Sequence, residues 1–159
     1  MSKNIILRLA NEKDIDSVLE LSNIVADIHG KERGDILKTH PRHITKERFF
    51  NYICETNRFI IVIEDSKKIV GIMLCKIKHI VDDNKFKDNF VFQIEDTCLY
   101  EEYRNKGYSD KMMNMAKEIA KANNCQRMEA AVWNFNKSSI AFFKKNSFKE
   151  QRIIYECFL

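Results

Sequence analysis

The sequence contains few residues that break secondary structure, since its 159 residues include only four glycines and one proline. With a hydrophobic content of 45%, this scarcity excludes a disordered or fibrous chain. Long apolar runs are also missing: the longest, Phe59 to Ile63 and Ile69 to Cys75, are far too short to cross a bilayer. Met1 to Asn11 mixes polar and apolar residues. We therefore expect no secretory signal, no membrane contact and a cytoplasmic protein.

The cysteines and histidines lack the patterns of metal sites. The five cysteines are an odd number, widely spaced and without a C-x-x-C pair, which argues against a disulfide framework and a zinc site. His29, His40 and His43 are irregularly spaced, and no set of Asp or Cys completes a site, so we expect surface-loop histidines and no bound metal. The formal charge is only +4 and the basic residues are spread along the chain, which argues against nucleic acid as a partner.

No repeat, low-complexity tract or linker divides the chain, so we expect one domain over residues 1–159. The segment from Asp27 to His43 is polar and irregular. The hydrophobic patterns around it indicate an α+β fold with a central mixed sheet and helices on both faces. The expected strands are Asn4 to Arg8, Arg58 to Glu64, Ile69 to Ile80, Phe90 to Leu99, Arg127 to Trp133 and Phe148 to Phe158. One expected helix starts near Asn11. Three others cover Thr45 to Glu55, Gly107 to about Asn123, and Lys137 to Lys145.

A basic turn with one glycine joins the strand that ends at Leu99 to the next helix. It runs from Arg104 through Gly107 to Asp110. The first free N–H groups of the helix and its positive dipole end lie in this turn, where a pyrophosphate could bind. A side chain at Gly107 would hold the phosphate away from the backbone. Taken alone, an ordinary strand–turn–helix connection explains the pattern equally well.

Two adjacent carboxylates, Glu95 and Asp96, interrupt an otherwise apolar strand. Alternation along the strand predicts Glu95, Thr97 and Leu99 on one face and Asp96 with Cys98 on the other. Such carboxylates need partners or a wet cleft. Glu95 therefore either forms an ion pair with a neighbouring strand, or lines a cleft and accepts a proton from an incoming ammonium, directly or through water.

These elements together resemble the GNAT superfamily of N-acetyltransferases over nearly the whole chain. Arg104 and Gly107 match the Arg/Gln-x-x-Gly-x-Gly/Ala element that cradles the pyrophosphate of acetyl-coenzyme A in that family, with Ser109 where Gly or Ala is usual. Asn136 to Phe148 resembles the second cofactor element of the family, with Ser147 in place of the usual Gly. The turn there either needs no left-handed residue or takes it from Asn146. The resemblance implies a GNAT-like, mostly antiparallel sheet of about six to seven strands.

The resemblance also implies an activity. It indicates an N-acetyltransferase that moves an acetyl group from acetyl-CoA to a primary amine by direct attack in a ternary complex. Glu95, nine residues before Arg104, takes the role of general base, and the amide of Leu99, at a bulge ending the strand, binds the oxyanion. A homodimer through the last strands is common in the family. The implied cofactor-binding residues are Thr97, Cys98, Leu99, Arg104, Asn105, Lys106, Gly107, Tyr108, Ser109, Asp110, Asn136, Ser139 and Phe143.

One residue departs from the family in a way that bears on catalysis. Phe143 stands where a Tyr usually donates a proton to the departing thiolate. A thiol with a pKa of roughly 8.5 leaves fairly readily as the anion, so we expect a working but slower transferase, with water, Tyr100 or Tyr108 able to serve. The alternative is a non-catalytic acyl-CoA-binding or regulatory module on the same fold. Retention of Glu95 favours the enzyme. The acceptor is expected to contact the segment from Asp27 to His43, whose charges of both signs leave its identity open.

Overall fold

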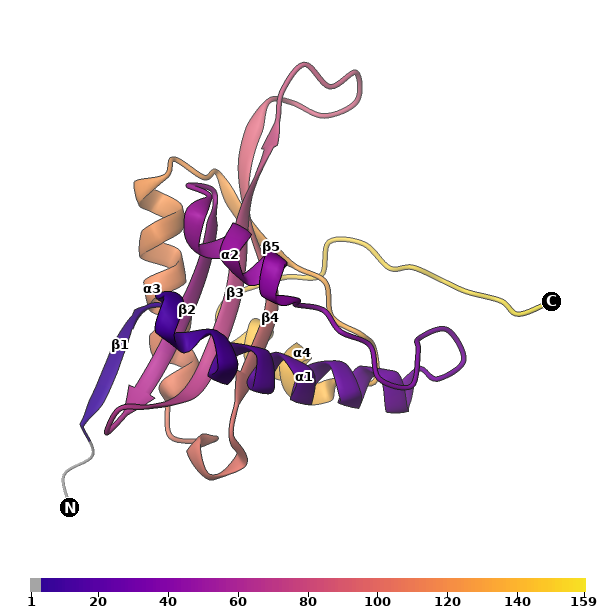
Figure 1. The fold of residues 1–159 in the computed structure, drawn as a ribbon. Helices are drawn as coiled ribbons and strands as arrows, with labels where there is room; N and C mark the ends of the chain where they lie inside the picture. The colour runs from indigo at the N-terminus through magenta and orange to yellow at the C-terminus, as the bar shows by residue number, and fades with distance from the viewer. Residues whose placement is uncertain (1–3) are drawn as a thin grey trace.

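The computed structural model describes residues 4–159. Residues 1–3, on which the expected lack of a secretory signal partly rests, lie outside the described residues. Within residues 4–159 a five-stranded sheet has the order β1-β2-β3-β4-β5, which is also the order of the strands in the chain (Figure 1). The first four strands are antiparallel neighbours and β5 joins β4 in parallel. They are β1 (Ile5–Leu9), β2 (Arg58–Asp65), β3 (Lys68–Ile80), β4 (Asn89–Leu99) and β5 (Arg127–Ala130).

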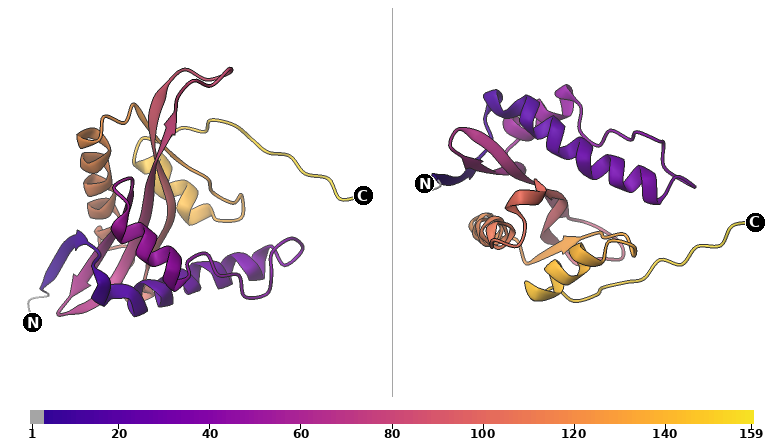
Figure 2. Two further views of the ribbon diagram at one scale, coloured as in Figure 1. Left: turned by 45° about the horizontal axis from the view of Figure 1, so that its top comes forward. Right: turned by 90° about the horizontal axis from the view of Figure 1, so that it is seen from below.

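Helices cover both faces of the sheet (Figure 2). On one face, α1 (Ile15–Glu32) and α2 (Lys46–Cys54) bury Leu21 and Phe49 against the sheet. On the other face, α3 (Tyr108–Ala122) buries Met112 and Ala116, and α4 (Lys137–Lys145) packs Phe142 at the border of the same core. Short 3-10 helices cover Glu12–Asp14 (η1) and Glu101–Tyr103 (η2).

The apolar runs of the sequence become the middle of the sheet. Ile60 to Ile63 in β2 and Ile69 to Cys75 in β3 are buried without interruption, because helices cover both faces of these central strands. Helix α2 begins where the Thr45 hydroxyl accepts a hydrogen bond from the Arg48 amide at 3.2 Å. Within residues 4–159, no helix has the length and apolar character needed to span a bilayer.

The predicted fold class is confirmed: the fold is α+β, with a mostly antiparallel sheet and helices on both faces. The predicted number of strands was too high. Residues 149–159 do not form the expected last strand, but run away from the body as an exposed, extended segment (yellow in Figure 1). The strand expected to reach Trp133 ends at Ala130, because its pairing with β4 stops at Ile94 and Ala130.

The segment expected to be irregular from Asp27 starts later than predicted. Helix α1 continues to Glu32, and Gly30 lies inside it. This glycine serves packing, since a Cβ on Gly30 would lie 2.7 Å from the Cδ of Pro41. The returning chain therefore crosses the helix at close range and brings His43 back toward the sheet.

A β-bulge in β4 changes the predicted faces of the carboxylates. Leu74 of β3 lies opposite Asp96 and Cys75 lies opposite Ile94, so that Glu95 is the extra residue. At a bulge, two residues of one strand oppose a single residue of its neighbour. Glu95 and Asp96 both point to the face of α1 and α2, and the prediction of opposite faces was wrong.

Candidate functional site

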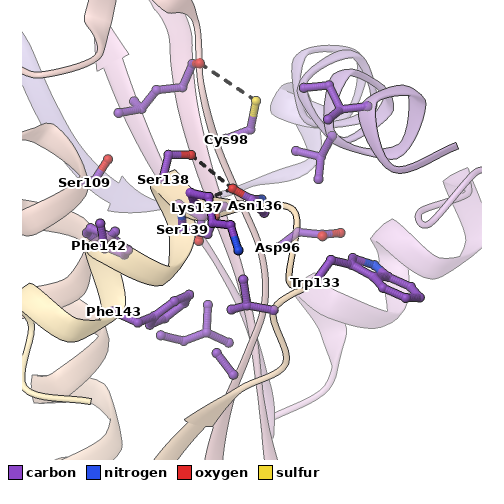
Figure 3. Close-up of a pocket in the computed structure, with 18 of the residues that line it drawn as sticks. Asp96, Cys98, Ser109, Trp133, Asn136, Lys137, Ser138, Ser139, Phe142 and Phe143 are labelled. Carbon is purple, nitrogen blue, oxygen red and sulfur yellow. Dashed lines mark hydrogen bonds between the residues drawn. The ribbon is translucent and has the colours of Figure 1, made fainter. Parts of the chain in front are cut away.

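A cleft of about 1120 Å³ opens where β4 and β5 separate beyond Ile94 and Ala130. Its walls are the end of β4, the beginning of α3, the second half of α1 and the chain that runs from β5 into α4 (Figure 3). The structure brings to this cleft every residue predicted to contact the cofactor except Lys106. The Nζ of Lys106 donates instead to the carbonyl of Glu102 in the same turn.

The turn before α3 has a backbone that exposes N–H groups. Asn105 and Gly107 both have left-handed φ angles, of 56° and 78°. The first intrahelical bond runs from the Lys111 amide to the Gly107 carbonyl, at 3.1 Å. The amides of Tyr108, Ser109 and Asp110 therefore precede the hydrogen-bonding pattern of the helix and have no helical acceptor. Such a helix N-terminus favours anions.

Backbone geometry at the end of β4 points the Leu99 amide away from β3. The next amide, of Tyr100, donates to the Val70 carbonyl of β3 at 3.1 Å. Because successive amides of a strand point to opposite edges, the Leu99 N–H points to the edge that β5 no longer covers. The expected bulge does occur in β4, but it lies at Glu95, before the predicted strand end, and β4 separates from β5 after Ile94.

Two neighbours hold Leu99 in place. The Arg104 Nε donates to the Leu99 carbonyl at 3.2 Å, which ties the strand end to the turn. Across the ladder, Leu99 lies opposite Gly71. A Cβ on Gly71 would lie 2.2 Å from the Leu99 Cδ2, so the Leu99 side chain occupies the space that any other residue at position 71 would need.

The position of Glu95 agrees with the geometry of both alternatives that the sequence left open. Its Oε1 lies 2.5 Å from the Lys76 Nζ of β3 and 3.8 Å from an Arg48 Nη, and its Oε2 accepts from the Tyr52 hydroxyl. It therefore forms the ion pair with a neighbouring strand, and it also lines the cleft. Burial raises the pKa of Glu95 above its ordinary value, although Arg48 opposes the rise.

A smaller cavity of about 210 Å³ adjoins the cleft on the side of α1 and α2. The two hollows have wall residues in common, among them the carboxylates of Glu95 and Asp96. The residues of both walls are His29, Glu95, Asp96, Ala131 and Trp133, and the smaller cavity adds His43, Arg48, Tyr52 and Leu74. Two compartments therefore meet at the bulge of β4.

Two of the histidines belong to this second cavity. The His43 Nδ1 lies 3.2 Å from the Asp96 Oδ2, and the rings of His29 and His43 have centroids 5.6 Å apart. The prediction of surface-loop histidines was wrong for these two and correct for His40, whose side chain is 71% exposed. The one signal in the sequence was the need of Asp96, inside an apolar strand, for a partner. Among residues 4–159, no group of three or more potential ligands could hold a metal ion.

The second cofactor element forms the opposite wall of the cleft. Asn136 caps α4, its Oδ1 accepting from the Ser139 amide at 3.1 Å. Phe143 packs edge-on against Phe148, with ring centroids 5.1 Å apart. Ser147 itself adopts the left-handed φ of 70°, so the turn does need this conformation and Asn146 does not supply it.

Three solved structures illustrate the fold. A mutant protein from Bacillus halodurans has a TM-score of 0.91 at 24% identity, covering 97% of this chain and 99% of its own. An aminoglycoside N-acetyltransferase in complex with CoA has a TM-score of 0.78 at 13% identity, with coverage of 99% and 96%. A transcriptional regulator from Bacillus halodurans has a TM-score of 0.76 at 16% identity, with coverage of 98% and 100%. At these identities the likeness concerns the fold.

Curated protein sequences include no match to this chain. The model of the acetyltransferase (GNAT) family matches residues 22–148, well over half of the sequence and all of the cleft elements described above. The chain belongs to the acetyltransferase (GNAT) family.

Proposed function

We propose that this single-domain protein is a cytoplasmic N-acetyltransferase that moves an acetyl group from acetyl-CoA to a primary amine. The observation that carries the proposal is the meeting of two compartments at Glu95 and Asp96. One compartment has the turn at Gly107 and the free strand edge, and the other has carboxylates that can accept hydrogen bonds from an amine. A ternary complex needs such a pair of neighbouring sites. A relative with the same fold is an aminoglycoside N-acetyltransferase in complex with CoA.

On the cofactor side, backbone groups do most of the binding. The pyrophosphate accepts hydrogen bonds from the amides between Asn105 and Asp110, and the pantetheine arm extends along the free edge of β4 past Thr97 and Cys98. The acetyl carbonyl then reaches the Leu99 amide, which stabilises the oxyanion that forms on attack. Asn136 and Ser139, at the beginning of α4, bind the pantetheine from the opposite wall.

Direct attack by the amine is favoured over an acyl-enzyme. Cys98 is the cysteine that lines the cleft, and it is only 5% exposed. Burial raises the pKa of Cys98 to about 11, so the thiol stays protonated and is a poor nucleophile. The amine therefore attacks the thioester itself, once Glu95 has removed a proton from its ammonium form.

The thiolate departs without help from Phe143. Of the tyrosines Tyr100 and Tyr108, the hydroxyl of Tyr100 already donates to Glu20 at 2.5 Å, while Tyr108 lines the cleft. Tyr108 or water is thus better placed to supply a proton. If neither sufficed, the chain would be the acyl-CoA-binding or regulatory module named as the alternative.

We further propose a homodimer through residues 149–159. Ile154 and Tyr155 are 83% and 88% exposed, an unfavourable position for large apolar side chains unless a partner covers them. The extended backbone of this segment is ready to pair as a strand with a second copy. Within the described chain, one contact that holds it is the ion pair between Glu156 and Arg33, at 2.8 Å.

Gly107→Val should weaken acetyl-CoA binding at least ten-fold, about 1.4 kcal/mol. The reason is the loss of the left-handed turn that presents the amides. Isothermal titration calorimetry measures the change, with circular dichroism to verify the fold. Lys106→Ala is the matched control, because its ammonium already bonds the Glu102 carbonyl, and it should bind nearly as the wild type does. If Gly107→Val bound acetyl-CoA with unchanged affinity, the pyrophosphate would not bind at this turn.

Glu95→Gln should lower kcat/KM roughly 10²-fold at pH 7, and the loss should shrink toward pH 10. Glu95 makes free amine from ammonium, which bulk hydroxide does unaided at high pH. The measurement is thiol release from acetyl-CoA with a panel of amines, peptides and aminoglycosides. Glu129→Gln, a carboxylate of β5 paired with Lys78 at 2.8 Å, is the control. If the ratio of mutant to wild-type kcat/KM stayed constant between pH 7 and pH 10, Glu95 would have a structural role only.

Phe143→Tyr should raise kcat by no more than about ten-fold, with little change in acetyl-CoA affinity. The thiol is already a fair leaving group, so a new proton donor has little left to contribute. Steady-state kinetics measure the effect, with Phe148→Tyr as a control hydroxyl on the neighbouring ring. A hundred-fold gain would identify a crippled transferase and favour the binding module.

The pair of substitutions Ile154→Asp and Tyr155→Asp should convert the dimer to a monomer. Buried carboxylates at a paired strand are unfavourable, whereas in an exposed segment they cost nothing. Sedimentation equilibrium measures the mass, and Lys149→Asp, an exposed position at the start of the segment, should leave it unchanged. A wild type that is monomeric at every concentration would refute the proposal.

A further inference from the structure

The smaller cavity, in which we place the acceptor amine, contains a second titratable group beside Glu95, the imidazole of His43. His43 lies in the chain just before α2, and its ring Nδ1 is 3.2 Å from the Asp96 Oδ2. The side chain of Asp96 is 8% exposed and that of His43 is 32% exposed. The imidazole thus connects a buried carboxylate of the β4 bulge to solvent.

Charged groups from three elements surround this imidazole. Asp96 and Glu95 lie on β4, His29 on α1, and Arg48 on α2, with an Arg48 Nη donating to the His43 carbonyl at 2.7 Å. The hydrogen bond with Asp96 raises the pKa of His43 above its ordinary 6.5, while burial and Arg48 act against the rise. Burial lowers the pKa of His29, so His43 is the imidazole of the pair that is poised to bind a proton near neutrality.

The carboxylate also selects which nitrogen of His43 can act. A carboxylate accepts hydrogen bonds, so the contact with Asp96 places the proton of the neutral ring on Nδ1. The Nε2 then has a free lone pair, and no hydrogen bond to it forms within residues 4–159. His43 is a base whose orientation and tautomer are fixed in advance.

The chemistry of amide formation needs two proton acceptors. A protonated primary amine loses one proton to become nucleophilic, and its nitrogen loses a second as the C–N bond forms. The balanced reaction consumes R–NH₃⁺ and the thioester, and yields the amide, the free thiol and one proton. Glu95 supplies one acceptor, and no second one was expected from the sequence.

We propose that His43, oriented by Asp96, is the second proton acceptor of the acceptor site, a role that rests on the proposed function. Glu95 takes the proton of the ammonium, and His43 Nε2 takes the second proton as the nitrogen bonds to the acetyl carbon. When the C–S bond breaks, the proton held by Glu95 returns to the thiolate through Tyr108 or water, which makes up for the hydrocarbon ring of Phe143. His43 then loses its proton to solvent through its exposed edge, and both bases are restored.

The test is the pH dependence of thiol release from acetyl-CoA with tyramine, spermidine, a lysine-containing peptide and kanamycin as acceptors. Protonated imidazole cannot accept a proton, so wild-type kcat/KM should fall as the pH drops through the pKa of His43. His43→Gln should lower kcat/KM roughly 10²-fold and abolish this ionisation, with acetyl-CoA affinity unchanged. Asp96→Asn should move the same ionisation to lower pH, and NMR titration of the His43 ring should show the same displacement.

His40→Gln is the matched control, because His40 bonds Asp27 at 3.3 Å and lines neither cavity. It should keep the wild-type profile. An ionisation that persists in His43→Gln, or a loss of less than about two-fold, would overturn the role of His43 while leaving the transferase intact. Absence of thiol release by the wild type with all four amines would overturn the proposed function, and the role of His43 with it.

Discussion

The separation of β4 from β5 is the constraint on which the rest of the site depends. The parallel ladder stops at Ile94 and Ala130, and the backbone beyond it has no strand partner on that edge. An unpaired strand edge is costly inside a protein unless something else satisfies its amides. In the cleft, these backbone N–H groups are available to a ligand. The turn at Gly107 and the capped end of α4 border the same space.

The bulge at Glu95 is the second half of this arrangement. A regular strand would send Glu95 and Asp96 to opposite faces, with one of them in the core against α3. The extra residue instead points both carboxylates at α1 and α2, where Lys76 and His43 meet them. Two carboxylates are thereby concentrated in one cavity, and the α3 side of the sheet keeps an apolar core.

Sequence patterns predicted what depends on local chemistry. The apolar runs of β2 and β3, the helix expected from Thr45 and the glycine turn each follow from a few neighbouring residues, and motif resemblance located the walls of the cleft. The patterns failed where the outcome depends on distant parts of the chain. The bulge at Glu95 arises from the register with β3, and the burial of His43 from the return of the chain across Gly30. The terminal segment has strand-like composition, but within the described chain it lies beside no strand edge.

Gly71 shows how far the site extends beyond the residues that line it. This residue of β3 faces no part of the cleft, yet its bare Cα leaves the room in which the Leu99 side chain lies. Any larger residue there would displace the Leu99 side chain, and its Cβ would also lie 3.2 Å from the Cys98 carbonyl oxygen. A side chain at position 71 would therefore disturb residues that line the cleft, although Gly71 itself does not line it. The packing thus requires a residue without a side chain at position 71, because Leu99 of the neighbouring strand occupies that space.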